Sequence, residues 1–198
     1  MENLENNKGK KRSTREHIIT GFRELLLNGS FERITVTGIC KHVGVSRKTF
    51  YTYFRDKNDI VEQIIFDNIS KPILDLHIIL KDYDSATTII LERIYQALYD
   101  DRAFFEKISF YTGQNSFQEI IIEQTSAINL QLLAEYNMPA IEKEYMAHYY
   151  AASHAMILVK WINDKMPISP KVMAGFYEKW ALKYWNNLKL SLNHYNLP

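Results

Sequence analysis

The chain has 198 residues, enough for one medium domain or for a small domain followed by a larger one. Hydrophobic residues make up 46% of it, and scarce Gly (7) and Pro (5) favour helices over a fold with many turns. The single cysteine, Cys40, excludes an intrachain disulfide, and no run of about 20 apolar residues is present to span a membrane, so we expect a cytoplasmic protein.

The charges are unevenly distributed along the chain. Residues 1–60 carry 12 Lys and Arg against 7 Asp and Glu, a net charge of +5. Residues 61–198 carry 12 against 16, a net charge of −4, although the whole chain has a net charge of only +1. A basic N-terminal part before an acidic remainder predicts that the N-terminal part binds a polyanion.

Four helices are predicted in the N-terminal part. Residues 1–12 are expected to form a disordered basic arm, and Ser13 with Glu16 forms a capping box that starts a helix ending at Asn28-Gly29. Further helices are expected to start at Thr35, Ser46 and Asp56. Pro72 is expected to kink or end the fourth helix.

Five more helices are predicted beyond residue 80. Helical spacing of apolar residues and capping residues place them at about 85–100, 102–112, 115–136, 139–164 and 169–190. The sequence therefore predicts an all-α fold of about nine helices. We divide it into the arm (1–12), a three-helix domain (13–58) and a larger helical domain (59–198).

Residues 35–54 have the pattern of a helix-turn-helix, a DNA-binding motif. Small Cys40 lies where the two helices would pack, and Gly44 suits a turn with positive φ. Four apolar residues fix the crossing: Ile39, Val43, Val45 and Phe50. The outer face of the second helix carries donors for phosphates or base edges, at Arg47, Lys48, Thr49 and Thr52. The alternative is a pair of packed helices in an unrelated bundle.

Residues 13–60 resemble the TetR family of transcriptional regulators. The resemblance lies in Thr35-Val36, Ile39-Cys40, Val43-Gly44-Val45-Ser46, Phe50-Tyr51-Thr52-Tyr53-Phe54, Lys57 and Asp59-Ile60. The sequence departs from the family at Cys40, where Ala is usual, and at Asn58, where an acidic residue is common. The larger domain is similar mainly in architecture, through Phe104-Phe105-Glu106-Lys107 with Gly113, Trp161-Ile162 and Pro167-Ile168-Ser169-Pro170.

The resemblance implies roles for residues of the helix-turn-helix. Thr35 and Tyr51 correspond to hydroxyls that contact phosphate, and Lys57 to a lysine on the DNA backbone. Arg47, Lys48 and Thr49 occupy base-reading positions. The full set of predicted DNA contacts is Thr35, Thr37, Ser46, Arg47, Lys48, Thr49, Tyr51, Thr52, Tyr53 and Lys57. The expected partner is a near-palindromic double-stranded operator.

The resemblance also implies that the larger domain encloses a small-molecule effector and forms a homodimer through its last two helices. Apolar residues crowd those helices beyond what one buried face needs, which supports a partner surface. The predicted pocket residues are Phe105, Ile108, Tyr111, Tyr150 and His154, each of which could equally be ordinary core. No cofactor, metal or membrane partner is expected.

Two functions remain open from the sequence. The first is a repressor that a small-molecule ligand releases from operator DNA; the second is an adaptor or co-activator whose larger domain binds a protein. An enclosed apolar cavity of about 300–1,000 Å³ would favour the first. No phosphate-binding Gly loop, paired-cysteine metal site or nucleophile motif is visible, so we do not expect an enzyme.

Overall fold

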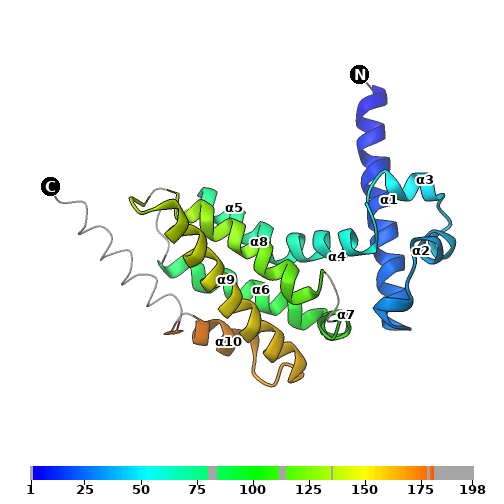
Figure 1. Ribbon diagram of the computed structural model, residues 1–198. Helices are drawn as coiled ribbons and strands as arrows, with labels where there is room; N and C mark the ends of the chain where they lie inside the picture. The colour runs from blue at the N-terminus through cyan, green and yellow to red at the C-terminus, as the bar shows by residue number, and fades with distance from the viewer. Residues whose placement is uncertain (1, 80–83, 112–114, 135, 178, 181–198) are drawn as a thin grey trace. The chain divides into compact units, whose positions relative to one another are not determined.

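A computed structural model describes residues 2–79, 84–111, 115–134, 136–177 and 179–180 of the chain (Figure 1). These residues are mostly helical and contain no strand, which confirms the predicted all-α fold. The chain divides into two compact units, residues 1–64 and residues 65–198, called here the N-terminal and C-terminal units. The division falls inside the fourth helix.

The N-terminal unit contains α1 (Glu2–Leu27), the 3-10 turn η1 (Phe31–Arg33), α2 (Val36–Val43), α3 (Arg47–Tyr51) and α4 (Lys57–Ile65). Its core includes Phe22, Phe50 and Phe54, which are almost fully buried. Helix α1 begins at Glu2 and not at Ser13, so residues 2–12, expected to be disordered, have helical backbone. No proline interrupts this segment, and extending a helix adds one hydrogen bond per residue once the first turns have formed.

A long helical run joins the two units. Helix α4 continues through the π turn η2 (Phe66–Ser70) into α5 (Lys71–Ile79), so Pro72 does not end the helix. At the end of η2 the Lys71 N–H donates to the Phe66 oxygen, five residues back. Proline has no N–H to donate, and the wider turn before Pro72 is the irregularity that accommodates it.

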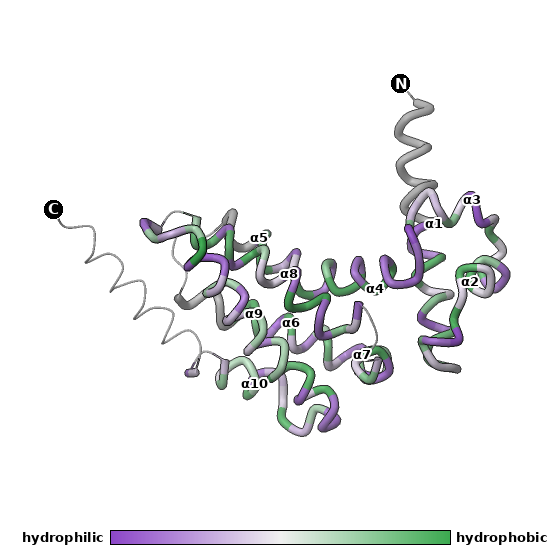
Figure 2. The backbone as a smooth tube through the Cα atoms, in the orientation of Figure 1, coloured by the Kyte–Doolittle hydropathy of each residue, from purple (hydrophilic) through white to green (hydrophobic). Residues whose placement is uncertain are grey.

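In its described residues the C-terminal unit contains α5 and five further helices: α6 (Asp84–Asp100), α7 (Arg102–Ser109), α8 (Phe117–Leu132), α9 (Ala140–Asn163) and α10 (Pro170–Tyr177). Helix α9 packs along α8, and α10 packs against α6. Hydrophobic and hydrophilic residues alternate along these helices, as expected for elements that bury one side (Figure 2). The predicted last helix extends to residue 190, and its part beyond residue 180 lies outside the described residues.

Candidate nucleic-acid interface

The helix-turn-helix forms from local signals that the sequence contains. The Thr35 hydroxyl accepts from the Gly38 N–H at 3.0 Å and caps α2. Gly44 ends α2 with φ 69°, a left-handed conformation that glycine adopts without strain. The Ser46 hydroxyl then accepts from the Thr49 N–H at 3.0 Å and caps α3. Fully buried Phe50 fixes which face of α3 points inward.

The ten residues predicted to contact DNA differ in exposure. Three of them are half-buried, namely Thr49, Tyr53 and Lys57. The other seven are exposed: Thr35, Thr37, Ser46, Arg47, Lys48, Tyr51 and Thr52. The exposed residues of α3 therefore lie opposite Phe50 and leave two cations accessible to a polyanion.

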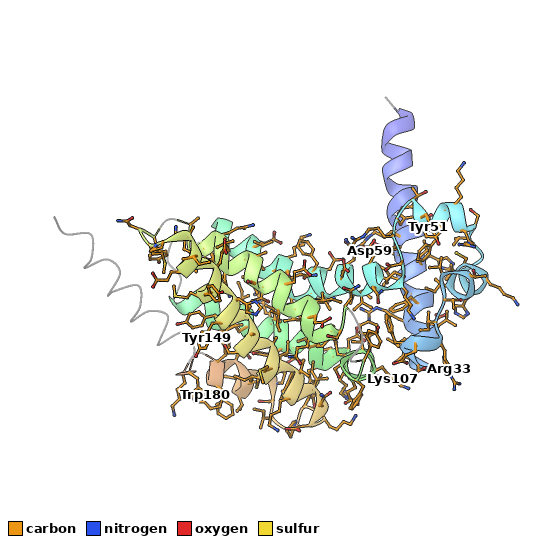
Figure 3. All side chains as sticks on the ribbon, viewed as in Figure 1. Arg33, Tyr51, Asp59, Lys107, Tyr149 and Trp180 are labelled. Atoms are coloured by element: carbon orange, nitrogen blue, oxygen red, sulfur yellow. The ribbon has the colours of Figure 1, made fainter. Side chains whose placement is uncertain are left out.

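Arg47 and Tyr51 form a pair on the exposed face of α3. The Arg47 Nη2 donates to the Tyr51 hydroxyl at 3.2 Å, and the guanidinium carbon lies 5.7 Å from the centre of the Tyr51 ring. This hydrogen bond raises the pKa of Arg47, so the guanidinium stays charged. Tyr51 is 49% exposed and is labelled in Figure 3. In the free protein, Tyr51 thus holds the Arg47 side chain along the helix surface.

The Lys57 ammonium contacts backbone oxygens of the protein itself, whereas the sequence predicted a contact with DNA phosphate. Its Nζ donates to the backbone oxygens of Phe31 at 2.6 Å, Ile34 at 2.9 Å and Glu32 at 3.3 Å. The same Nζ lies 4.3 Å from the centre of the Phe31 ring. These contacts turn the ammonium toward the protein in the free chain.

Two features of the N-terminal unit were missed in the sequence. Gly21 of α1 lies so close to α2 that a Cβ at this position would be 2.0 Å from the Val43 Cγ1. On the same side, the His17 Nε2 lies 3.1 Å from the Val43 oxygen, and the His42 Nε2 lies 2.7 Å from a Glu24 carboxylate oxygen. A glycine in the middle of an amphipathic helix is a signal of close helix packing that could have identified the first feature.

A buried polar pair lies inside the C-terminal unit. The Tyr95 hydroxyl and the His154 Nε2 are 2.9 Å apart, and both side chains are buried. Burial lowers the pKa of His154 to about 4 and raises that of Tyr95, so both are neutral near pH 7. The rings of Trp161 and Tyr177 pack against this pair. No hydrogen bond of the His154 Nδ1 is found among the described residues.

The five predicted pocket residues have different surroundings. Phe105 and Ile108 are buried on the inner face of α7, where Phe105 packs against Phe104 and Phe117. Tyr150 is half-buried against a cluster around Leu133, and Tyr111 is half-buried beyond the end of α7. Helical spacing could not separate pocket positions from core positions, because both require apolar residues on the same helix face.

His154 alone of the five borders a cavity described here. This cavity has about 30 Å³, room for about one water molecule, and is lined by Ser153, His154, Ile157, Met173, Phe176, Tyr177 and Trp180. A larger open groove of about 480 Å³ runs along α8 beside His148. The described residues contain no group of three or more His, Cys, Asp or Glu placed to hold a metal ion. Within the same residues, no helix is both long and apolar enough to cross a membrane.

Two family profiles match this chain. The profile of bacterial regulatory proteins of the tetR family matches residues 18–64, the part that contains α2, the turn and α3. A transcriptional regulator C-terminal region matches residues 86–181. The chain belongs to the TetR family of transcriptional regulators. The family resemblance expected from the helix-turn-helix is thereby confirmed and extends to the C-terminal unit.

Relatives of this chain are found by sequence among regulators of the helix-turn-helix type. The chain is 24% identical over 157 residues to the uncharacterised regulator YxbF of Bacillus subtilis. The aligned region covers 76% of this chain but only 40% of YxbF. The chain is 21% identical over 146 residues to DhaS of Lactococcus lactis, an activator of the dhaKLM operon, covering 71% of this chain and 74% of DhaS.

Solved structures share the fold. A TetR-family regulator from Syntrophomonas wolfei is 20% identical to this chain and has a TM-score of 0.59. The superposed region covers 85% of this chain and 93% of the Syntrophomonas chain. The dihydroxyacetone kinase operon activator DhaS is 19% identical, has a TM-score of 0.57 and covers 86% of this chain and 95% of its own. These similarities establish the architecture for both units.

Proposed function

We propose that this TetR-family regulator binds a near-palindromic operator as a homodimer and is a repressor released by a small molecule. The observation that carries the DNA-binding part is the geometry of α3. Its capped N-terminus, the left-handed Gly44 before it and buried Phe50 present Arg47 and Lys48 to solvent. A short helix that displays cations in this way suits the major groove.

Arg47→Ala and Lys48→Met are expected to fail differently in DNA binding. Loss of a guanidinium that reads a base edge reduces affinity for the preferred operator, on the order of 10-fold to 100-fold, and relaxes the preference at one base pair. Lys48 occupies the neighbouring base-reading position, so loss of its charge reduces affinity and relaxes the preference at a different base pair. Binding of each variant to a set of operators with single base changes measures both effects. Unchanged base preference in Arg47→Ala would show that α3 does not read the bases through Arg47.

The proposed homodimer rests on exposed apolar residues of α9 and α10. On α9, Ile141, Tyr145 and Tyr149 follow one another at intervals of four residues and are each more than half exposed. Trp180, 50% exposed and stacked on Phe176, lies with Tyr149 on one side of the C-terminal unit (Figure 3). Large apolar side chains gathered on one surface are typical of a protein interface. A two-fold dimer requires a near-palindromic operator.

Met156→Glu, in the same face of α9, is expected to convert the dimer to a monomer. Met156 is 62% exposed in the free chain, so the substitution leaves the core intact and places a charge in the proposed interface. Sedimentation velocity at micromolar concentration measures the change. Ile89→Glu on α6 is the matched control, because Ile89 is 56% exposed and outside this face. Equal sedimentation of both variants and the wild-type chain would contradict the proposed interface.

The ligand-responsive part of the proposal rests on Tyr95 and His154. A buried, neutral histidine whose Nδ1 faces no protein partner among the described residues can hydrogen-bond a small molecule. Met173 and Tyr177 of α10 line the small cavity beside it, which a ligand would have to widen. Solved relatives of this fold include a repressor, AlkX of Dietzia, as well as the activator DhaS. The alternative of an adaptor that binds a protein through the C-terminal unit is not favoured by the family match.

The effector proposal is tested by measuring how operator DNA changes the affinity of the chain for its small-molecule effector. Tryptophan fluorescence of the chain is titrated with candidate metabolites in the presence and absence of operator DNA. A repressor released by its effector must bind that effector more weakly on DNA, by the same factor, typically 5- to 150-fold, by which the effector weakens operator binding. Equal effector affinity in both titrations would contradict this mechanism.

A further inference from the structure

The position of the proton on the neutral His154 ring is decided by Tyr95. The Tyr95 hydroxyl is fully buried, and its hydrogen-bond partner among the described residues is the His154 Nε2, at 2.9 Å. A buried donor without an acceptor is costly, whereas an oxygen tolerates an unused lone pair, so the hydroxyl donates to Nε2. A neutral imidazole has one N–H and one acceptor nitrogen. Because Nε2 is the acceptor, the imidazole proton lies on Nδ1.

The Nδ1–H group of His154 has open space beside it. It has no hydrogen-bond partner among the described residues. In the same part of the chain, the fully enclosed side-chain nitrogen and oxygen atoms without a partner are limited to the Asn58 Oδ1, so the His154 Nδ1 is not sealed off. His154 lines the cavity of about 30 Å³ between α9 and α10. A hydrogen-bond donor therefore lies at the wall of this cavity.

The rest of the cavity wall is mainly apolar and aromatic. Its apolar and aromatic members are Ile157, Met173, Phe176, Tyr177 and Trp180. Ser153 also lines the cavity, but its hydroxyl donates to the Tyr150 oxygen at 3.0 Å. The described lining residues include no Lys, Arg, Asp or Glu, so a charged ligand would lose its hydration without gaining a counter-charge. Aromatic rings and a methionine sulfur favour contact with another aromatic ring.

We infer that the ligand of the C-terminal unit is an uncharged aromatic molecule with a hydrogen-bond acceptor, such as a carbonyl oxygen, to which the His154 Nδ1–H donates. The inference rests on the release by a small molecule proposed above and names the chemical class of that molecule. The cavity has room for about one water molecule, so the ligand needs the space of a neighbouring side chain. The half-buried Tyr177 ring lies 4.4 Å from the imidazole, centre to centre. A ligand ring in its place keeps this packing and adds the hydrogen bond to Nδ1.

Four compounds with the same ring and different substituents test the chemical class. They are acetophenone with a carbonyl, ethylbenzene with no acceptor, negatively charged benzoate and positively charged benzylamine. Each is titrated into the full-length chain with ¹³C-labelled histidine rings, and the signal that His154→Gln lacks gives the affinity at His154. We expect acetophenone to bind about 3- to 10-fold more tightly than ethylbenzene, because it uses the Nδ1–H donor. Benzoate and benzylamine should bind at least about 10-fold more weakly than acetophenone.

Three results of these titrations would overturn the inference. The first is equal affinity for acetophenone and ethylbenzene, and the second is tighter binding of benzoate or benzylamine than of acetophenone. The third is a His154 signal that none of the four compounds changes. His148→Gln, an exposed position on the same helix, is the matched control and should bind acetophenone as the wild-type chain does.

The position of the proton is tested in the wild-type chain without a ligand. The ¹⁵N chemical shifts of the His154 ring distinguish a proton on Nδ1 from a proton on Nε2, and we expect Nδ1. Tyr95→Phe removes the hydroxyl that donates to Nε2, so the proton is no longer confined to Nδ1 and the preference for acetophenone over ethylbenzene should decrease. A wild-type chain with its proton on Nε2 would overturn the inference.

Tyr177→Ala provides a test whose expected result is a gain of binding. The substitution opens the space that the ligand takes, so acetophenone should bind more tightly, by on the order of 10-fold. Weaker binding to this variant would overturn the placement of the ligand beside His154. Operator affinity is measured with and without acetophenone to separate this inference from the proposed function. Binding at His154 that leaves operator affinity unchanged would contradict release by a small molecule, whereas the ligand class would still be supported.

Discussion

Between pH 6.5 and pH 4, the free energy of unfolding of the C-terminal unit is expected to fall by about 3 kcal/mol on account of His154. Burial lowers the pKa of this side chain to about 4 in the folded unit, whereas an unfolded histidine titrates near its ordinary value of 6.5. In that pH window the unfolded chain binds a proton that the folded unit does not bind. Stability is therefore complete above pH 6.5 and is lost as the pH falls.

Urea denaturation at several pH values, compared between the wild-type chain and His154→Gln, isolates this contribution from that of carboxylates. Glutamine can still accept from the Tyr95 hydroxyl but does not titrate. His148→Gln on the same helix is the matched control, because His148 is exposed. We expect a flatter pH dependence for His154→Gln only. The same pH dependence in all three proteins would show that His154 is not held neutral by burial.

Phe50→Ala is expected to reduce the free energy of unfolding of the N-terminal unit by about 3–5 kcal/mol. Phe50 is fully buried, and its ring centre lies 5.8 Å from that of Phe54. Removing the ring leaves a cavity under α3, the helix that carries Arg47 and Lys48. DNA binding should be lost with the fold of this unit, whereas the dimer formed by α9 and α10 should persist.

Thermal unfolding followed by circular dichroism, together with sedimentation, measures these two outcomes. Thr52→Ala at the end of α3 is a suitable control, since its exposed hydroxyl donates only to the Lys48 oxygen at 3.1 Å. That variant should unfold close to the wild-type temperature. An N-terminal unit that keeps its stability in Phe50→Ala would contradict the packing that orients α3.

The features that the sequence predicted well depend on neighbouring residues. Thr35 and Ser46 cap their helices, and Gly44 adopts positive φ, because each of these roles is decided within a few positions of the chain. The boundaries of α6 and α9 follow for the same reason from the apolar spacing and from Pro139. The capping signal at Ser13 was misleading, because the helix begins before it and Ser13 lies inside α1.

The features that the sequence could not predict depend on contacts between distant segments. The approach of Gly21 to Val43 and the contacts of Lys57 with three oxygens before α2 join residues more than twenty positions apart. The family resemblance predicted a role for Lys57 but not the groups that surround it in this chain. The pocket prediction placed Phe105 with His154, although α7 buries Phe105 in ordinary aromatic packing.

Selection of bound DNA from a random pool by the full-length chain tests the central claim most directly. If α3 reads base edges in a two-fold dimer, the selected sequences converge on a near-palindrome whose half-sites are about one helical turn apart, roughly 34–36 Å, or somewhat wider. The same selection with Arg47→Ala should lose the preference at one position in each half-site. Selected sequences that share no motif, or a single unpaired site, would contradict the account.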